Sequence, residues 1–254
     1  MDSAFRSWAR DILAAAIFLT RLPLRWRGEW PPGLHASAQR AFPIVGAGTG
    51  LAGGAVYFVA HGVGLPPVLA AIAAVAVQAL LTGALHEDGL ADMADGLGGG
   101  RDRNRKLEIM RDSRIGSYGA IALMLGLAAR IGAIAAIGDP AATAAALVAS
   151  GAASRALLPF LTRHFDPARR DGIAATAGRP ALGIALTAGG LAILAAVVAI
   201  GIGAGLAAIA VAAAAAFGVA WIARRQLGGY TGDVLGAAQQ AAEIFFLLTL
   251  VACR

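Results

Sequence analysis

Seven long apolar segments, separated by short polar connections, constrain the fold of this 254-residue chain more than any other feature. A helix of about 20 apolar residues spans the hydrocarbon core of a bilayer. Only helices and closed barrels satisfy every backbone hydrogen bond in lipid, and the alternating pattern of barrel strands is absent. We therefore predict an all-α, polytopic transmembrane helical bundle. The expected spans are 42–60, 66–85, 117–137, 141–161, 181–200, 203–223 and 234–252.

The composition supports one membrane domain over residues 1–254. Hydrophobic residues make up 58% of the chain and charged residues only 14%, against about 25% charged in soluble domains. The net charge of +6 does not indicate nucleic acid, because the basic residues lie between apolar spans and follow the positive-inside rule. The partner expected from composition is the lipid bilayer. The basic connections, expected in the cytoplasm, are 22–41, 86–116, 162–180 and 224–233.

Two features near the N-terminus carry structural predictions. Residues 5–24 have a short apolar core flanked by Arg10 and Arg21, and an eighth crossing there would break the charge alternation. We expect an interfacial or re-entrant helix. Three glycines spaced four residues apart form a flat helix face, which predicts tight helix packing. They are Gly46, Gly50 and Gly54.

Residues 86–116 form the connection expected to carry the catalytic chemistry, since they contain seven acidic and six basic residues. Asp88, Asp92 and Asp95 lie within an arc of roughly 60° on one helical face. Like charges at this spacing repel, and Mg²⁺, which prefers oxygen ligands, would relieve the repulsion. The alternative is a solvated acidic rim at a helix end. His86 adjoins this face and is a candidate general base.

Basic residues follow this acidic face in the chain. Arginine side chains bind phosphate oxygens through two parallel hydrogen bonds, so several are candidate substrate ligands. The alternative is that they anchor the next span by the positive-inside rule. The candidates in this segment, together with the polar residues between them, are Arg105, Arg111, Asp112, Ser113 and Arg114.

A second polar group precedes and enters the last span. The sequence Gly-Gly-Tyr-Thr-Gly-Asp at 228–233 places glycines, Thr231 and Asp233 at a helix start, where backbone N–H groups bind anions. Asp233 is also an ordinary N-cap candidate. Glu243 falls near the middle of the span, where a carboxylate requires a polar cavity or a partner. Arg155 is a candidate for that partner or for a phosphate ligand, whereas Arg130 is expected to reach the outer surface.

These stretches closely resemble the cobalamin synthase family, the adenosylcobinamide-GDP ribazoletransferases. The resemblance rests on HEDGLADMADGL at 86–97, LEIMRDSRIG at 107–116 and GGYTGDVLGA at 228–237, and covers essentially the whole chain. Glu87 departs from it, because an apolar residue is expected there, and the added carboxylate would alter a metal site. Two N-terminal elements also match, FLTRLP at 18–23 and FPIVG at 42–46.

The resemblance implies an Mg²⁺-dependent transferase of a bacterial inner membrane with its active site facing the cytoplasm. The substrates would be adenosylcobinamide-GDP and α-ribazole or its 5′-phosphate, and the products adenosylcobalamin or its phosphate and GMP. Asp95 or His86 would accept the proton of the attacking hydroxyl. A homo-oligomer and a complex with other corrinoid enzymes are both left open. The implied metal ligands are Asp88, Asp92, Asp95 and Asp233, with Glu87 beside them, and the implied substrate ligands are Arg105, Arg111, Arg114, Arg155, Thr231 and Glu243.

Two other functions compete with this interpretation. Membrane CDP-alcohol phosphotransferases of phospholipid synthesis perform the same kind of displacement, but their pattern requires two later acidic residues four apart. Here the stretch 92–96 continues as Leu-Gly-Gly-Gly-Arg, so the pattern fails. A transporter would show two related halves with paired interrupted helices, and the sequence contains no such repeat.

Overall fold

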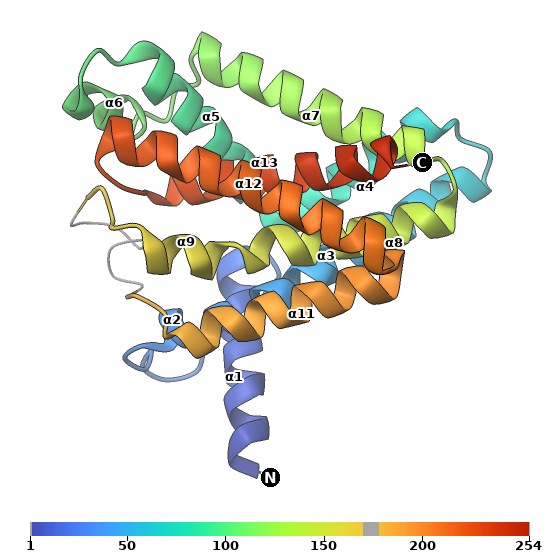
Figure 1. Cartoon of the computed structure of the whole chain (residues 1–254), viewed down its shortest axis with the longest axis horizontal. Helices are drawn as coiled ribbons and strands as arrows, with labels where there is room; N and C mark the ends of the chain where they lie inside the picture. The colour runs from blue at the N-terminus through green and yellow to red at the C-terminus, as the bar shows by residue number, and fades with distance from the viewer. Residues whose placement is uncertain (1, 170–177, 254) are drawn as a thin grey trace.

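The computed structural model describes residues 2–169 and 178–253, which form a helical bundle (Figure 1). An isolated parallel bridge joins Pro167 to Tyr230. The N-terminal half contains α1 (Asp2–Leu19), α2 (Leu34–Ala38), the 3₁₀ helix η1 (Gln39–Ala41), α3 (Phe42–Gly62), α4 (Pro67–Thr82), α5 (Leu85–Gly99) and α6 (Arg103–Ile109). The C-terminal half contains α7 (Ser117–Ile137), α8 (Pro140–Ala156), α9 (Leu158–His164), α11 (Leu182–Ile200), α12 (Ile202–Leu227) and α13 (Gly232–Ala252).

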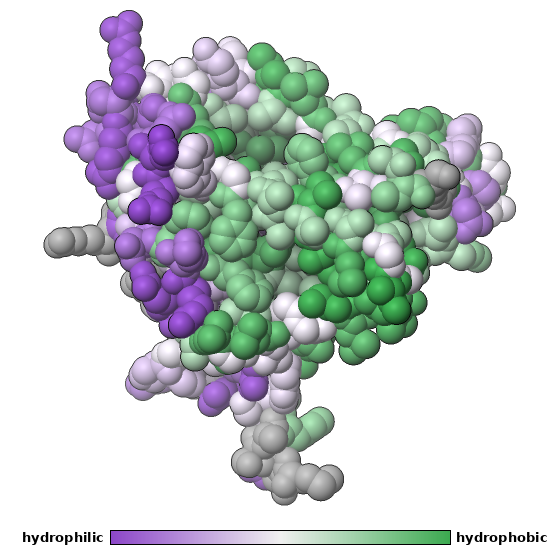
Figure 2. All heavy atoms as spheres, viewed as in Figure 1, coloured by the Kyte–Doolittle hydropathy of each residue, from purple (hydrophilic) through white to green (hydrophobic). Residues whose placement is uncertain are grey.

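The apolar helices confirm the prediction of a multi-spanning membrane bundle. Six helical segments of the described chain are long and apolar enough to cross a membrane, and a bent pair of helices raises the number to seven. Figure 2 shows hydrophobic side chains over the middle of the bundle and many hydrophilic residues at the end that carries α6 in Figure 1. The six segments are Leu34–Gly62, Ser117–Ile137, Pro140–His164, Leu182–Ile200, Ile202–Leu227 and Gly232–Ala252.

The remaining expected span, 66–85, is not one straight helix. Helix α4 ends at Thr82 after 16 residues, and α5 continues at 89° to it. The break comes from two successive residues in the left-handed region, Gly83 (φ 65°) and Ala84 (φ 55°). The expected loop at 86–116 is correspondingly wrong in form, because most of it is helical and α5 packs against α7 and α13.

The glycine face predicted on α3 is confirmed, and it packs against α8. A Cβ added to Gly46 would lie 2.1 Å from the carbonyl oxygen of Gly151. A Cβ added to Gly50 would lie equally close to the carbonyl oxygen of Leu147, and one on Gly54 would meet Ala144 at 2.8 Å. Since backbone atoms cannot move aside, these positions require glycine for the two helices to approach.

The N-terminal helix is fixed to the bundle by a buried carboxylate. Asp11 on α1 is 0% exposed and accepts a hydrogen bond from Arg40 at 2.6 Å. Ser37 donates to its other oxygen at 3.0 Å. Helix α1 ends at Leu19 rather than near residue 24, and its interfacial or re-entrant position stays a prediction.

Candidate functional site

The acidic face lies on α5, which crosses α13 at a pair of glycines. A Cβ added to Gly89 would lie 2.7 Å from the carbonyl oxygen of Asp233 and 3.2 Å from the Cα of Gly236. The two helices can therefore approach this closely only because both positions are glycine. It brings Asp88 and Asp92 of α5 alongside Asp233 in the first turn of α13. Two motifs separated by more than one hundred residues thus meet at one point.

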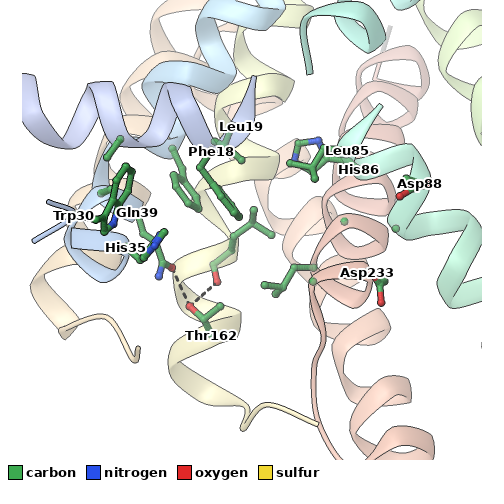
Figure 3. A pocket seen from close by; sticks show the side chains of 18 residues that line it. Phe18, Leu19, Trp30, His35, Gln39, Leu85, His86, Asp88, Thr162 and Asp233 are labelled. Atoms are coloured by element: carbon green, nitrogen blue, oxygen red, sulfur yellow. Dashed lines mark hydrogen bonds between the residues drawn. The ribbon is translucent and has the colours of Figure 1, made fainter. Parts of the chain in front are cut away.

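A cavity of about 210 Å³ lies beside the acidic residues, between α1, α2, α5, α9 and α13. Asp88, Asp233 and the buried His86 are part of its lining. Figure 3 shows Asp88 and Asp233 on one side of this cavity and the aromatic side chains of α1 and the α2 region on the other. The Nε2 atom of His86 is buried and has no hydrogen-bond partner among the described residues.

The carboxylates of Asp88, Asp92 and Asp233 lie close enough to repel one another. Arg169 offsets part of this charge, with a guanidinium nitrogen 3.7 Å from Asp233 Oδ2. Within residues 2–169 and 178–253, no three histidine, cysteine, aspartate or glutamate side chains converge closely enough to hold a metal ion. Metal binding by this cluster therefore stays a prediction.

Asp95 belongs to a different contact from the other two aspartates of α5. Its Oδ2 accepts a hydrogen bond from the backbone N–H of Gly116 at 2.7 Å, and its Oδ1 accepts one from Gly119 at 2.8 Å. A Cβ on Gly119 would lie 2.3 Å from this carboxylate. Asp95 thus binds the orphan N–H groups at the start of α7, and its roles as metal ligand and base stay predictions.

Glu87 also lies apart from the expected metal site. Its carboxylate is buried and accepts a hydrogen bond from Arg130 at 2.8 Å. Arg130 is 2% exposed, so the expectation that it reaches the outer surface is wrong. It donates to Glu243 at 3.0 Å and to Gln78 at 3.1 Å. A charge inside a membrane requires such partners, and α4, α5 and α13 supply them.

Glu243 has the intramembrane partners that its position demands. Besides Arg130, it lies 3.6 Å from Arg155 and accepts a hydrogen bond from Gln239 at 2.5 Å. Gln239 also donates to Ser154 at 3.0 Å. Of the two roles considered for Arg155, the structure supports the ion pair, because this arginine is only 4% exposed. We call the network of Gln78, Glu87, Arg130, Ser154, Arg155, Gln239, Gln240 and Glu243 the buried polar network.

The basic residues after α5 lie at the surface and outside the cavity lining. Arg105 pairs with Glu108 at 2.7 Å. Arg114 binds both oxygens of Asp112, and these hydrogen bonds hold the pKa of Asp112 at about 2. Arg111 and Ser113 are exposed beside this pair. Their predicted contacts with phosphate stay predictions.

The Gly-Gly-Tyr-Thr-Gly-Asp stretch connects α12 to α13 through its backbone. Gly228 ends α12 with φ 80°, and a Cβ on Gly229 would lie 2.2 Å from the carbonyl oxygen of Asp166. Thr231 is the N-cap of α13 and accepts from the N–H of Val234. It also donates to Asp233 at 3.1 Å. This arrangement fixes Asp233 at the mouth of the cavity, whereas the N-cap role considered for Asp233 falls to Thr231.

Sequence reasoning missed the aromatic side chains that line the cavity. Phe18, Trp30, His35 and Phe42 line it, and none of the four was predicted as a site residue. Their signal in the sequence is weak, because isolated aromatic residues in an N-terminal amphipathic segment are also typical of a membrane interface. Arg169 was likewise not predicted as a site residue, since it counted only as part of the basic connection 162–180.

The sequence comparisons decide the family. The model of the cobalamin-5-phosphate synthase family matches residues 11–251. This chain belongs to that family. The matched range includes α5, the 228–233 stretch and the whole cavity lining.

Individual relatives agree with the family match over nearly their full lengths. An adenosylcobinamide-GDP ribazoletransferase of Bradyrhizobium diazoefficiens is 46% identical, with 97% of this chain and 95% of the relative covered. Proteins of the same name from Azorhizobium caulinodans and Rhizobium meliloti are 47% and 44% identical, covering 94% and 93% of this chain and 94% of each relative. No solved structure matches this chain.

Proposed function

We propose that this protein is an adenosylcobinamide-GDP ribazoletransferase that works at the acidic side of the cavity. The observation that carries the proposal is the crossing of α5 and α13, which joins Asp88 and Asp92 to Asp233 beside a cavity. The same two stretches of sequence carry the family resemblance. An acidic cluster beside a cavity suits a reaction on a charged pyrophosphate, in which charge must be neutralised as the leaving phosphate departs.

The proposed reaction exchanges one phosphorus–oxygen bond for another. A ribose hydroxyl oxygen of α-ribazole, or of its 5′-phosphate, bonds to the phosphorus attached to the corrinoid arm. The bond from that phosphorus to the bridging oxygen of the pyrophosphate breaks, and GMP leaves with the bonding electrons. The hydroxyl proton passes to a base on the protein. Adenosylcobalamin or its 5′-phosphate remains.

The donor set at the crossing fits Mg²⁺. Asp88, Asp92 and Asp233 offer only oxygen ligands and repel one another without a cation. They form no closed cage, and Mg²⁺ usually keeps waters and substrate phosphates beside one or two carboxylates. Two of these three residues would hold the ion, which would supply charge neutralisation for the pyrophosphate.

His86 is the candidate base favoured by its surroundings. It lines the cavity next to Asp88, and its Nε2 lacks a hydrogen-bond partner among the described residues. Asp95, the other candidate, already accepts two backbone hydrogen bonds. Arg169, beside Asp233, is a candidate phosphate ligand, since its guanidinium already lies at the acidic cluster.

We place this site on the cytoplasmic side of a bacterial inner membrane. The basic connections lie at the same end of the bundle as α6, where Figure 2 has many of its hydrophilic side chains. Connections rich in arginine are retained in the cytoplasm. Protease cleavage at residues 101–106 in inverted vesicles would support this orientation, whereas cleavage only in right-side-out vesicles would reverse it.

The proposal is tested by GMP release from adenosylcobinamide-GDP and α-ribazole with protein in lipid nanodiscs. We expect Mg²⁺ to raise the unfolding temperature of the wild type, and we expect Asp92→Asn to abolish this rise and to lower turnover by about 100-fold. Asp139→Asn is the matched control, because Asp139 is the remote N-cap of α8 and asparagine also caps helices.

Two outcomes would contradict the proposal. Absence of GMP release by the wild type with Mg²⁺ present would exclude the reaction. Equal activity of Asp92→Asn and Asp139→Asn would exclude the acidic cluster as its site. Release of CMP from a CDP-alcohol by the wild type would instead favour the phospholipid alternative.

A further inference from the structure

The cavity has two chemically different sides. On one side lie the carboxylates of Asp88 and Asp233, and on the other lie aromatic side chains from α1 and the segment before α3 (Figure 3). The rings of Trp30 and His35 are tilted by 31° to each other, with centroids 4.9 Å apart. Phe18 stacks on Phe42 with centroids 5.9 Å apart. We call these four residues the aromatic wall.

The aromatic wall offers flat apolar surface, and the Nε1 atom of Trp30 is a buried donor in it without a hydrogen-bond partner among the described residues. The nearest polar side chains, Gln39 and Thr162, are both buried, and Thr162 donates to Gln39 Oε1 at 3.0 Å (Figure 3). A guanine base carries several donors and acceptors on its edges, and these would go unsatisfied here. A large apolar ring system matches the wall better, because aromatic rings stack on one another without specific hydrogen bonds.

The size of the cavity also limits its occupant. Its volume of about 210 Å³ lies below the roughly 300–1,000 Å³ of sites that enclose drug-sized ligands. It therefore suits a two-ring base with part of its sugar, rather than a corrinoid carrying a nucleotide. The nucleoside of the proposed reaction has this form, since it consists of an apolar benzimidazole base joined to ribose.

We propose that the aromatic wall binds the benzimidazole base of α-ribazole and directs its ribose toward Asp88, Asp233 and His86. This inference rests on the proposed function. The base stacks among Phe18, Trp30 and His35, and the sugar extends to the acidic side, where the attacking hydroxyl meets the phosphorus. Within the wall, Trp30 packs with Trp26 against a small separate core of Ala14, Leu34 and Ala38, whereas Phe42 belongs to the main core of the bundle.

The test separates the two substrates by their Michaelis constants. In nanodiscs, Trp30→Leu and Phe18→Leu should each raise the KM for α-ribazole about tenfold. The KM for adenosylcobinamide-GDP should not change, and Trp30→Phe should restore the ribazole KM because it keeps an aromatic face. Trp221→Leu is the matched control, since Trp221 is half exposed on α12 beside Arg225.

Three results would overturn the inference while leaving the proposed function in place. In the first, active Trp30→Leu and Phe18→Leu variants show an unchanged KM for α-ribazole. In the second, the KM for adenosylcobinamide-GDP rises instead, which places the guanine base in the cavity. In the third, the variants lose bound phospholipid but keep both constants, which assigns the cavity to an acyl chain.

Direct binding keeps the inference testable if the wild type releases no GMP. Equilibrium dialysis of α-ribazole against wild type, Trp30→Leu and Trp221→Leu measures the subsite without turnover. We expect binding to the wild type and to Trp221→Leu, and about tenfold weaker binding to Trp30→Leu. Equal binding to all three, or none to the wild type, would overturn the inference.

Discussion

Glu87 and Asp88 are neighbours on α5, yet they lie in opposite electrostatic environments. Glu87 points into the buried polar network, where Arg130 donates to it at 2.8 Å. Asp88 points into the cavity, beside Asp92 and Asp233. Successive residues of a helix are about 100° apart, so one helix presents both faces.

The two regions differ in how their charge is balanced. In the buried polar network, two arginines accompany two glutamates, and each glutamate lies within 3.0 Å of Arg130. At the acidic cluster beside the cavity, Arg169 offsets the charge of Asp233 and Asp92. A buried group of balanced charges holds helices together, whereas an acidic group open to a cavity attracts a cation. Charge that is paired inside the bundle therefore holds helices together, whereas the acidic group beside the cavity is where we propose that the chemistry takes place.

The largest loss of stability is expected from replacing Arg130, the cation that both glutamates of the buried polar network share. Arg130→Leu leaves Glu87 and Glu243 facing each other with only Arg155 to offset them. Breaking a buried pair costs about 3–5 kcal/mol, so we expect little folded protein in detergent, measured by size-exclusion yield and thermal unfolding. Arg114→Ala, at an exposed pair, should change neither quantity. Wild-type stability of Arg130→Leu would remove the distinction between the two regions.

Neutralising the two neighbours on α5 should change stability in opposite directions. Glu87→Gln removes a charged hydrogen-bond acceptor from Arg130 and should lower the free energy of unfolding by about 1.5–3 kcal/mol. Asp88→Asn removes repulsion with Asp92 one turn away and should raise it by about 0.2–0.5 kcal/mol, while lowering GMP release. Chemical denaturation without Mg²⁺ measures both changes. Changes of the same sign would contradict the comparison.

A smaller loss of stability is expected at Gly89, the glycine of α5 at the crossing with α13. In Gly89→Ala the new methyl group would meet the backbone of Asp233 at 2.7 Å, and overpacking of this kind costs about 1–3 kcal/mol. We expect GMP release to fall further than stability, since α5 and α13 separate where Asp88 meets Asp233. Gly132→Ala is the control, because a Cβ there meets nothing within 4 Å. Equal activity of the two variants would show that the crossing is not needed for the site.

The local signals of this chain were strong enough to predict much of the fold. Apolar length predicted the spanning helices, because a bilayer requires about 20 residues for each one. Residue spacing predicted the glycine face of α3 and the acidic face of α5, because both depend only on the helical repeat. The resemblance carried by 86–97 and 228–237 predicted the family that the comparisons confirm.

Tertiary contacts decided the partners of individual charged side chains, which the sequence pattern left open. The spacing of Asp88, Asp92 and Asp95 is regular, yet the backbone N–H groups of Gly116 and Gly119 take up Asp95. Arg130 resembles a surface arginine in the sequence, and its partners on α4, α5 and α13 come together only when the bundle forms.

The sequence by itself therefore determined the membrane helices, the acidic face and the family. Only the tertiary structure decided which carboxylates are paired and which border a cavity, and that Phe18, Trp30 and His35 lie opposite them. The physical reason is that helix formation and membrane insertion follow local hydrophobicity. The electrostatic environment of a side chain, in contrast, depends on partners that are distant in the chain.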